Sequence, residues 1–316
     1  MTLTRRRFIT VSAGASASLL MPGAAPAADL VRWDGYAMGA GTSLTIAGRP
    51  RAEAERLIAA ARAEIERLEQ LFSVYRADSA LVRLNSTGRL AGPHADMLAL
   101  FSTVDAIHAA TGGAFDPTVQ PVWSLVAEAS GRPDRSALDK ALENVGWAHV
   151  RHDIAEIAFS RPGMAITLNG IAQGYATDRV AAFLKAAGLG NVLVSVGEIA
   201  AIGERTAGEP WRVGLAENAG GVAEETLPLC DMAVATSAPY ATRLDADGAV
   251  GHILDPRRGP VASDWRRISV VHPSAAIADG LSTAFALLLN EQIAEIAGGF
   301  GARVIGVNRA GDRFAV

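Results

Sequence analysis

An aspartate and a threonine near the carboxyl end of the chain have the spacing of a cation site. Asp279 and Thr283 lie four residues apart in an apolar segment of helical character, so both side chains share one face of the predicted helix. One carboxylate and one hydroxyl, completed by backbone carbonyl oxygens, suit a hard cation such as Mg²⁺. A capping aspartate followed by a threonine directed into the core is the alternative interpretation, and the spacing leaves both open.

Two glycine-rich segments could bring backbone N–H groups close to an anion. In 167–178 a predicted strand ends, a glycine-rich turn follows and a helix begins, and a helix N-terminus of this kind favours a phosphate. The spacing is not G-x-G-x-x-G, so a nicotinamide site of the Rossmann type is not supported. The segment 36–42 also holds closely spaced glycines, although a plain turn explains them equally well.

Two further segments combine turn residues with ionisable side chains. In 111–118, two glycines precede Phe115 and Asp116, which places a ring and a carboxylate on a tight loop; a helix end followed by a turn is the alternative. In 251–259, His252 and Asp255 precede an arginine-rich turn and could act as a general base and the carboxylate that orients it. Turn formation alone explains the same residues.

Composition excludes several kinds of protein and site. The 316 residues carry 29 basic and 33 acidic side chains, a formal net charge of −4 that is too small and too mixed in sign for a nucleic-acid binder. The single cysteine, Cys230, rules out an intramolecular disulfide and a cysteine-rich zinc or iron–sulfur site. Any metal must therefore bind oxygen or histidine ligands.

The first 28 residues predict an export signal. Three consecutive arginines at 5–7 precede a weakly apolar stretch that is too short to span a bilayer, and a small-residue cleavage pattern follows at 25–27. Such arginines are typical of twin-arginine export, which predicts a periplasmic location; an ordinary basic N-terminus is the alternative. Removal of 1–28 would leave 26 bases against 33 acids, so the mature chain, 29–316, would carry a formal charge of −7.

The periodicity of apolar residues predicts helices and strands mixed along the whole mature chain. No repeat, charge block or low-complexity linker divides it, which favours one compact α/β or α+β domain with a central sheet flanked by helices. The predicted strands cover 36–46, where the strand is entered through a glycine-rich turn, and 191–196, 269–271 and 303–307. The predicted helices cover 52–72, 96–110, 136–144, 174–187 and 277–289.

Taken together and in order, these segments resemble the ApbE family, the FAD:protein FMN transferases, over nearly the whole mature chain. The family's Gly-Ala-Phe-Asp-Pro-Thr-Val run is matched letter for letter at 113–119, and His-Ile-x-Asp-Pro-x-x-Gly is kept at 252–259. Seven matches in the family's order are not expected by chance. They fall at 38–42, 73–85, 113–119, 170–178, 234–237, 252–259 and 278–284.

The resemblance implies a reaction and assigns residues to it. FAD would be cleaved at its pyrophosphate, FMN would be joined through its phosphate to a threonine hydroxyl of a partner flavoprotein, and AMP would leave. The metal, expected to be Mg²⁺, would rest on Asp279, Thr283 and the backbone oxygen of Gly170. His252 or Asp255 would accept the proton of the hydroxyl. The residues expected to contact FAD are Met38, Tyr75, Arg76, Ala114, Phe115, Asp116, Thr167, Gln173 and Ile253.

Three departures from the family pattern alter the expected flavin contacts. Thr167 stands where the family usually has Asp, Gln173 where it has Lys or Glu, and Val196 where it has the first glycine of Gly-Gly-Glu. The Thr-Leu-Asn-Gly-Ile-Ala-Gln-Gly variant at 167–174 resembles a branch that serves nitrous-oxide-reductase maturation. That resemblance implies an acceptor in a membrane-associated electron-transfer protein.

Two other functions fit the same residues. A periplasmic FAD-binding protein without transfer activity would bind flavin and label no partner. A Mg²⁺-dependent FAD pyrophosphatase would use water in place of threonine and release free FMN. Retention of Asp279 and Thr283 argues against a purely passive binder, but the sequence does not separate transferase from hydrolase.

Overall fold

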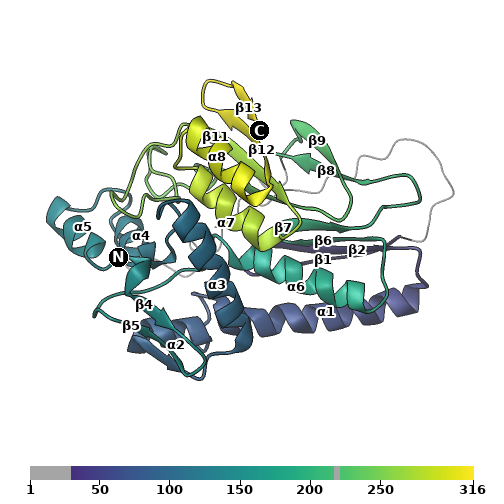
Figure 1. Ribbon diagram of the computed structural model, residues 1–316, viewed down its shortest axis with the longest axis horizontal. Helices are drawn as coiled ribbons and strands as arrows, with labels where there is room; N and C mark the ends of the chain where they lie inside the picture. Colours follow the sequence, from purple (N-terminus) through teal and green to yellow (C-terminus); the bar gives the residue numbers. More distant parts are fainter. Residues whose placement is uncertain (1–29, 217–220) are drawn as a thin grey trace.

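The central sheet of this protein is antiparallel. The computed structural model describes residues 30–216 and 221–316, and within them eight strands form one sheet in the order β1-β2-β6-β7-β10-β11-β12-β13 (Figure 1). Each neighbouring pair runs antiparallel, so the predicted mixture of helix and sheet is confirmed in its α+β form. The strands are β1 (Leu30–Ala37), β2 (Ala40–Ala47), β6 (Val192–Val196), β7 (Glu198–Ile202), β10 (Ala233–Ser237), β11 (Trp265–His272), β12 (Arg303–Asn308) and β13 (Arg313–Ala315). The predicted export signal, 1–28, lies outside the described residues.

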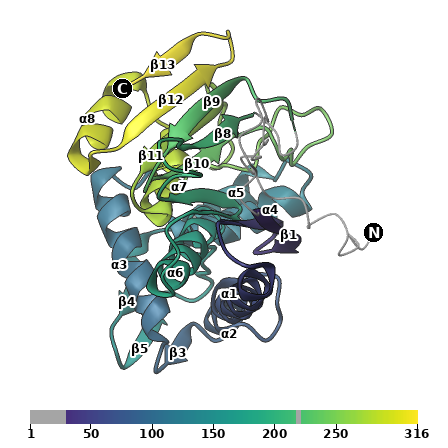
Figure 2. The same cartoon turned by 90° about the vertical axis from the view of Figure 1, so that its right-hand side faces the viewer.

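Helices cover one face of this sheet. α6 (Ala172–Ala186) and α7 (Ala275–Phe285) pack directly on strands, α1 (Arg51–Phe72) runs beside α6, and α3 (Ala95–Ala110) packs on α7. α1 and α6 are seen from the side in Figure 1 and nearly end-on in Figure 2. α8 (Asn290–Phe300) follows α7 and contacts β12. None of the described helices is long and apolar enough to cross a membrane.

A two-stranded hairpin, β8 (Trp211–Leu215) and β9 (Glu225–Leu229), packs on the opposite face of the sheet. Successive side chains of a strand point to opposite faces. On β7, Ile199 and Ala201 therefore join the apolar cluster under the hairpin, while Glu198 is directed to the side of the helices. Because of this alternation Glu198, the one acidic residue of β7, faces α7.

Shorter elements complete the domain beside α3. Three of their strands form a separate small sheet in the order β3-β5-β4. Only one of these elements, α5, matches a predicted segment, because the others are too short to show a clear periodicity. They are α2 (Ala80–Thr87), β3 (Arg89–Ala91), the 3₁₀ turn Pro117–Val119, α4 (Gln120–Glu128), α5 (Arg135–Leu142), the 3₁₀ turn Trp147–His149, β4 (Val150–His152) and β5 (Glu156–Phe159).

Four predicted helices are confirmed as α1, α3, α5 and α6, and three predicted strands as β6, β11 and β12. The strand predicted within 36–46, entered through a glycine-rich turn, is confirmed as β2, and β1 before that turn was not predicted. Met38 and Gly39 both have positive φ angles, 54° and 78°, so the chain reverses there and forms the hairpin of β1 and β2. Helix 277–289 has different ends, because the Ser274 side chain accepts the N–H of Ile277 and starts α7 earlier, and α7 ends at Phe285.

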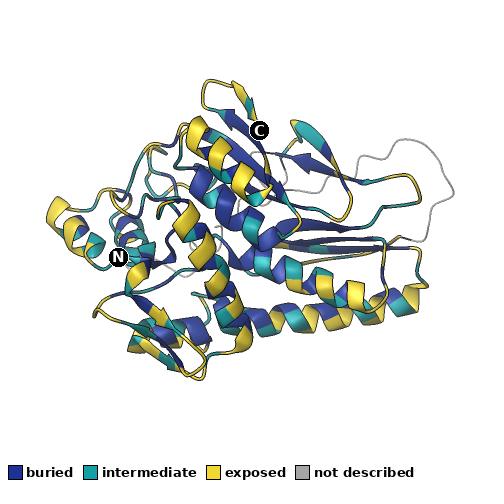
Figure 3. Cartoon of the chain, viewed as in Figure 1, coloured by how far each residue is buried: buried dark blue, intermediate teal, exposed yellow. Residues whose placement is uncertain are grey.

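α7 is buried along nearly its whole length. Figure 3 shows it almost entirely dark blue, whereas α1 and α8 each keep an exposed face. It packs on α3, α6, β10 and β11. An apolar surface on all sides is typical of a core helix, and any polar group on it must find its partners inside the protein.

Gly174 lets α6 approach α7 closely. A Cβ at this position would overlap the carbonyl group of Ala275 and the Cα of Ala276, which belong to the backbone of α7. We expect Gly174→Ala to lower the free energy of unfolding by about 1–3 kcal/mol, because the two helices must separate.

The matched control is Gly298→Ala in α8, where a Cβ would meet open space. Removal of a helical glycine there should raise the free energy of unfolding by up to about 1 kcal/mol. Urea denaturation measures both variants, and equal stabilities would contradict the close approach of α6 and α7.

Candidate functional site

A pocket opens where the N-terminus of α6 and the middle of α7 meet the ends of β7 and β10. Its cavity of about 120 Å³ brings together ten of the predicted site residues from segments far apart in the sequence. Met38, Tyr75 and Arg76 lie outside this lining, and so does Asp255. The ten are Ala114, Phe115, Asp116, Thr167, Gly170, Gln173, His252, Ile253, Asp279 and Thr283.

The three predicted metal ligands lie together. Thr283 Oγ1 donates to the carbonyl oxygen of Gly170 at 3.4 Å, and both residues line the pocket with Asp279. A Cβ on Gly170 would come within 2.9 Å of Thr283 Oγ1, so glycine keeps this approach open. The capping interpretation of Asp279 is wrong, because Ser274 caps α7 and Asp279 lies one turn inside it.

The helix N-terminus predicted to attract an anion holds the carboxylate of Asp279. Asp279 Oδ2 accepts the N–H of Gly174, in the first turn of α6, at 3.0 Å. The residue that precedes α6, Ile171, has no side chain that could cap it. The positive end of the helix dipole therefore stabilises and orients a predicted metal ligand.

Asp279 and Glu198 are two buried carboxylates in the same pocket. Only 4% of Asp279 and 3% of Glu198 is exposed. Burial raises the pKa of Asp279 to about 7, and burial together with the charge of Asp279 raises the pKa of Glu198 well above its usual range. Glu198 was not among the predicted site residues. Its signal in the sequence is its place in the Val-Gly-Glu variant of the family's Gly-Gly-Glu, directly after a buried strand.

This set of donors fits a small hard cation. Among the residues described, no lysine or arginine lines the pocket, so a bound cation would be the positive partner of the carboxylates. Carboxylate, hydroxyl and carbonyl oxygens are the ligands that Mg²⁺ takes. In the described part of the chain no three His, Cys, Asp or Glu side chains form a metal cage. The protein would therefore supply part of the coordination shell, which is usual for Mg²⁺ at a substrate phosphate.

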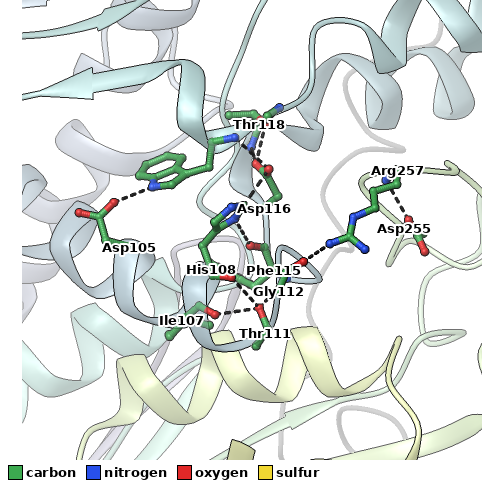
Figure 4. Close-up of polar contacts among 12 residues, drawn as sticks. Asp105, Ile107, His108, Thr111, Gly112, Phe115, Asp116, Thr118, Asp255 and Arg257 are labelled. Atoms are coloured by element: carbon green, nitrogen blue, oxygen red, sulfur yellow. Dashed lines mark hydrogen bonds and ion pairs between the residues drawn. The ribbon is translucent and has the colours of Figure 1, made fainter. Parts of the chain in front are cut away.

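Asp116 organises the loop that lines one wall of the pocket. Its Oδ1 accepts the backbone N–H (2.8 Å) and the hydroxyl (2.5 Å) of Thr118, and its Oδ2 accepts the N–H of Trp147 at 3.0 Å (Figure 4). Gly112 and Gly113 have positive φ, as a turn after a helix requires. The turn interpretation therefore accounts for the hydrogen bonds of the Asp116 carboxylate. The same loop brings Phe115 and Asp116 into the lining of the pocket.

His252 and Asp255 have separate partners. His252 Nδ1 lies 3.1 Å from the carbonyl oxygen of Pro239, and burial lowers the pKa of the imidazole. Asp255 Oδ1 accepts the N–H groups of Arg257 and Arg258, and its Oδ2 accepts the Arg258 guanidinium (Figure 4 draws the Arg257 bond). Asp255 therefore shapes the turn and does not orient His252. The catalytic role of either residue stays a prediction.

The hairpin turn at Met38 is fastened to the pocket by its backbone. Its carbonyl oxygen accepts from Gln173 Nε2 at 3.0 Å, and its N–H donates to Glu69 Oε1 at 2.6 Å. Gln173 lines the pocket, so Met38 lies at its rim. The neutral amide of Gln173 thus binds this turn and brings no positive charge to the pocket.

Tyr75 and Arg76 differ in how close they come to the pocket. The hydroxyl of Tyr75 accepts from Asn169 Nδ2 at 3.1 Å, and Asn169 lines the pocket. Tyr75 is half exposed, so its ring remains available at the entrance. The Arg76 guanidinium binds Glu66 on α1 at 2.5 Å, on the outer surface. Because the Arg76 side chain is paired with Glu66, its contact with FAD stays a prediction.

A raised carboxyl pKa makes the metal-free protein less stable as the pH rises. Asp279 has an ordinary pKa of 3.8 in the unfolded chain and about 7 when folded. Between these values the folded state keeps a proton that the unfolded chain has lost, so the free energy of unfolding falls as the pH rises from about 4 to about 7. The slope approaches about 1.4 kcal/mol per pH unit for one such group.

We expect Asp279→Asn to reduce this slope, because the amide does not titrate. Urea denaturation of the EDTA-treated wild type and variant at several pH values measures it. An unchanged slope in the variant would contradict the placement of a raised carboxyl pKa at Asp279.

Comparisons with known proteins agree with the geometry. The model of the ApbE family matches residues 38–304. The FAD:protein FMN transferase of Salmonella typhimurium is 28% identical over 310 residues, which cover 92% of this chain and 87% of that protein. The flavin transferase ApbE from Vibrio cholerae has a TM-score of 0.77 at 25% identity, covering 91% of this chain and 97% of that one.

The apo form of the Pseudomonas stutzeri flavinyl transferase ApbE has a TM-score of 0.78 at 26% identity, covering 93% of this chain and 97% of that chain. The residues matched by the family model include the Met38 turn at the rim of the pocket and the helix α7, which carries Asp279. This chain belongs to the ApbE family.

Proposed function

We propose that this protein transfers FMN from FAD to a threonine hydroxyl of a partner flavoprotein, the activity after which its relatives are named. The observation that supports it best is the meeting of Asp279, Thr283 and the Gly170 carbonyl in one pocket with His252. Oxygen ligands for a cation beside a partly buried imidazole suit chemistry at a phosphate.

The reaction balances as a substitution at phosphorus. The threonine oxygen forms a bond to the phosphorus of the FMN half, and the bond from that phosphorus to the bridging oxygen breaks. AMP leaves with the bridging oxygen, and the hydroxyl proton passes to a base. The protein's part is to hold the hydroxyl, the phosphorus and the leaving oxygen in line.

We propose Mg²⁺ as the cation, held by Asp279, Thr283 and the carbonyl oxygen of Gly170. When bound it would offset the negative charge of the pyrophosphate and of the departing AMP. In the described pocket lining no lysine or arginine could do so. The transfer is therefore expected to depend strictly on a divalent cation.

His252 is the favoured proton acceptor. Nδ1 lies next to the Pro239 carbonyl, which favours the ring proton on that nitrogen, and the imidazole also has a hydrogen bond to the backbone of Thr242. The lowered pKa keeps the imidazole neutral at pH 7, as a base must be. Asp255 is less suited, because both of its oxygens are engaged in the turn.

Intact mass tests the reaction directly. The mature protein is mixed with FAD, Mg²⁺ and a threonine-bearing acceptor domain, for which we choose a membrane flavoprotein of nitrous-oxide-reductase maturation. We expect the acceptor to gain one FMN and AMP to appear. Asp279→Ala and EDTA should each abolish the gain, and His252→Gln should slow it by about 10²–10⁴-fold. The exposed variant Asp153→Asn, on a distant turn, should behave as wild type.

Other products separate the remaining functions. Free FMN and AMP without a labelled acceptor would replace the transferase by an FAD pyrophosphatase. Bound, intact FAD after long incubation would indicate a flavin-binding protein. Labelling of other acceptor domains but not of the chosen one would rule out the nitrous-oxide-reductase branch alone.

We also propose that residues 1–28 direct the protein to the periplasm by the twin-arginine route. The support is in the sequence: three arginines, a mild apolar stretch and a small-residue cleavage pattern in the right order. A reporter that carries 1–28 should be exported, and replacement of Arg5 and Arg6 by lysine should retain it in the cytoplasm. Export unaffected by that change would rule out the twin-arginine route.

A further inference from the structure

Glu198 is a buried acidic side chain that the proposed reaction does not yet use. It stands at the start of β7, is 3% exposed and lines the pocket together with Asp279. Its Oε2 accepts the backbone N–H of Thr236 at 3.2 Å.

The backbone around Glu198 is held rigidly. Gly197 connects β6 and β7 with a φ of 86°, a conformation that glycine tolerates and other residues rarely adopt. The Glu198 carbonyl oxygen accepts the hydroxyl of Thr177 on α6 at 3.1 Å, and Glu198 pairs with Val196 across the hairpin. The side chain is therefore presented to the pocket by the sheet and by α6.

Two other buried carboxylates of the described residues have arginine partners. Glu156 binds Arg89 and Arg151, and Asp96 binds Arg67 at 2.6 Å. Glu198 and Asp279 each accept one backbone N–H, and no arginine or lysine of the described chain lines their pocket. Two buried carboxylates with so little compensation cost free energy unless a cation lies between them.

We propose that Glu198 is a second carboxylate facing the cation, opposite Asp279, and that it contributes to the affinity for that cation. The inference rests on the cation site of the proposed function and adds a residue from the sheet to donors from α7 and the 167–171 turn. The neutral Gln173 increases the need for the cation, because its amide is bound to Met38 and supplies no charge.

The experiment measures Mn²⁺, as a paramagnetic substitute for Mg²⁺, binding to the metal-free full chain without FAD. Electron paramagnetic resonance counts free Mn²⁺ during a titration. Relative to wild type, Glu198→Gln should weaken binding by about 10- to 100-fold, and Glu198→Asp, which keeps the charge, should retain more of the affinity. The control Glu156→Gln removes another buried carboxylate, outside the pocket, and should leave Mn²⁺ affinity unchanged.

Thermal unfolding of the metal-free proteins is the second measurement. Glu198→Gln should raise Tm, because it removes one of two like charges from a buried site, whereas Glu156→Gln should lower Tm by breaking two arginine pairs. A purely structural Glu198 would give the opposite result, a lower Tm with unchanged Mn²⁺ affinity, and would overturn the inference. Wild-type protein that binds no Mn²⁺ would overturn the proposed cation site, and the inference with it.

Discussion

The burial of two carboxylates in one pocket, with no positive side chain of the described residues beside them, is the constraint on which the rest of this site depends. Asp279 lies on a helix that is apolar on nearly all sides, so its charge has to be met inside the protein. The N-terminus of α6 meets it in part, through one N–H and the helix dipole. The remaining negative charge supports the proposed cation in this pocket and, through that cation, the proposed binding of a pyrophosphate.

Small residues make this convergence possible. At Gly170 the missing Cβ keeps the carbonyl open toward Thr283, at Gly174 it lets α6 touch α7, and at Gly197 a positive φ turns β6 directly into β7. Each of these glycines brings two elements closer than side chains would allow. The polar groups they bring together are backbone carbonyls, one hydroxyl and two carboxylates, a hard-oxygen environment suited to Mg²⁺ and not to a softer metal.

The hydrogen bonds of the motif residues separate these residues into two kinds. Asp116 and Asp255 use their carboxylates to hold loops, through hydrogen bonds to Thr118 and Trp147 and to the arginine-rich turn. Asp279 and His252 line the pocket, and their hydrogen bonds to the backbone of Gly174 and Pro239 hold them there. A motif therefore marks a region of the site, and the hydrogen bonds show which of its side chains hold the loops of that region.

The sequence by itself determined the mixed helix-and-sheet class, four helices (α1, α3, α5 and α6), the absence of an intramolecular disulfide and the shared helix face of Asp279 and Thr283, because all of these follow from composition or from local spacing. Tertiary structure decided what depends on contacts between distant segments. The pairing of β1 with β2 across the Met38 turn, the separation of Asp255 from His252, and the place of Glu198 in the same pocket as Asp279 depend on strand pairing and on alternation along β7. Local periodicity carries no information about which strand lies beside which, so these features appear only once the sheet and α7 are packed together.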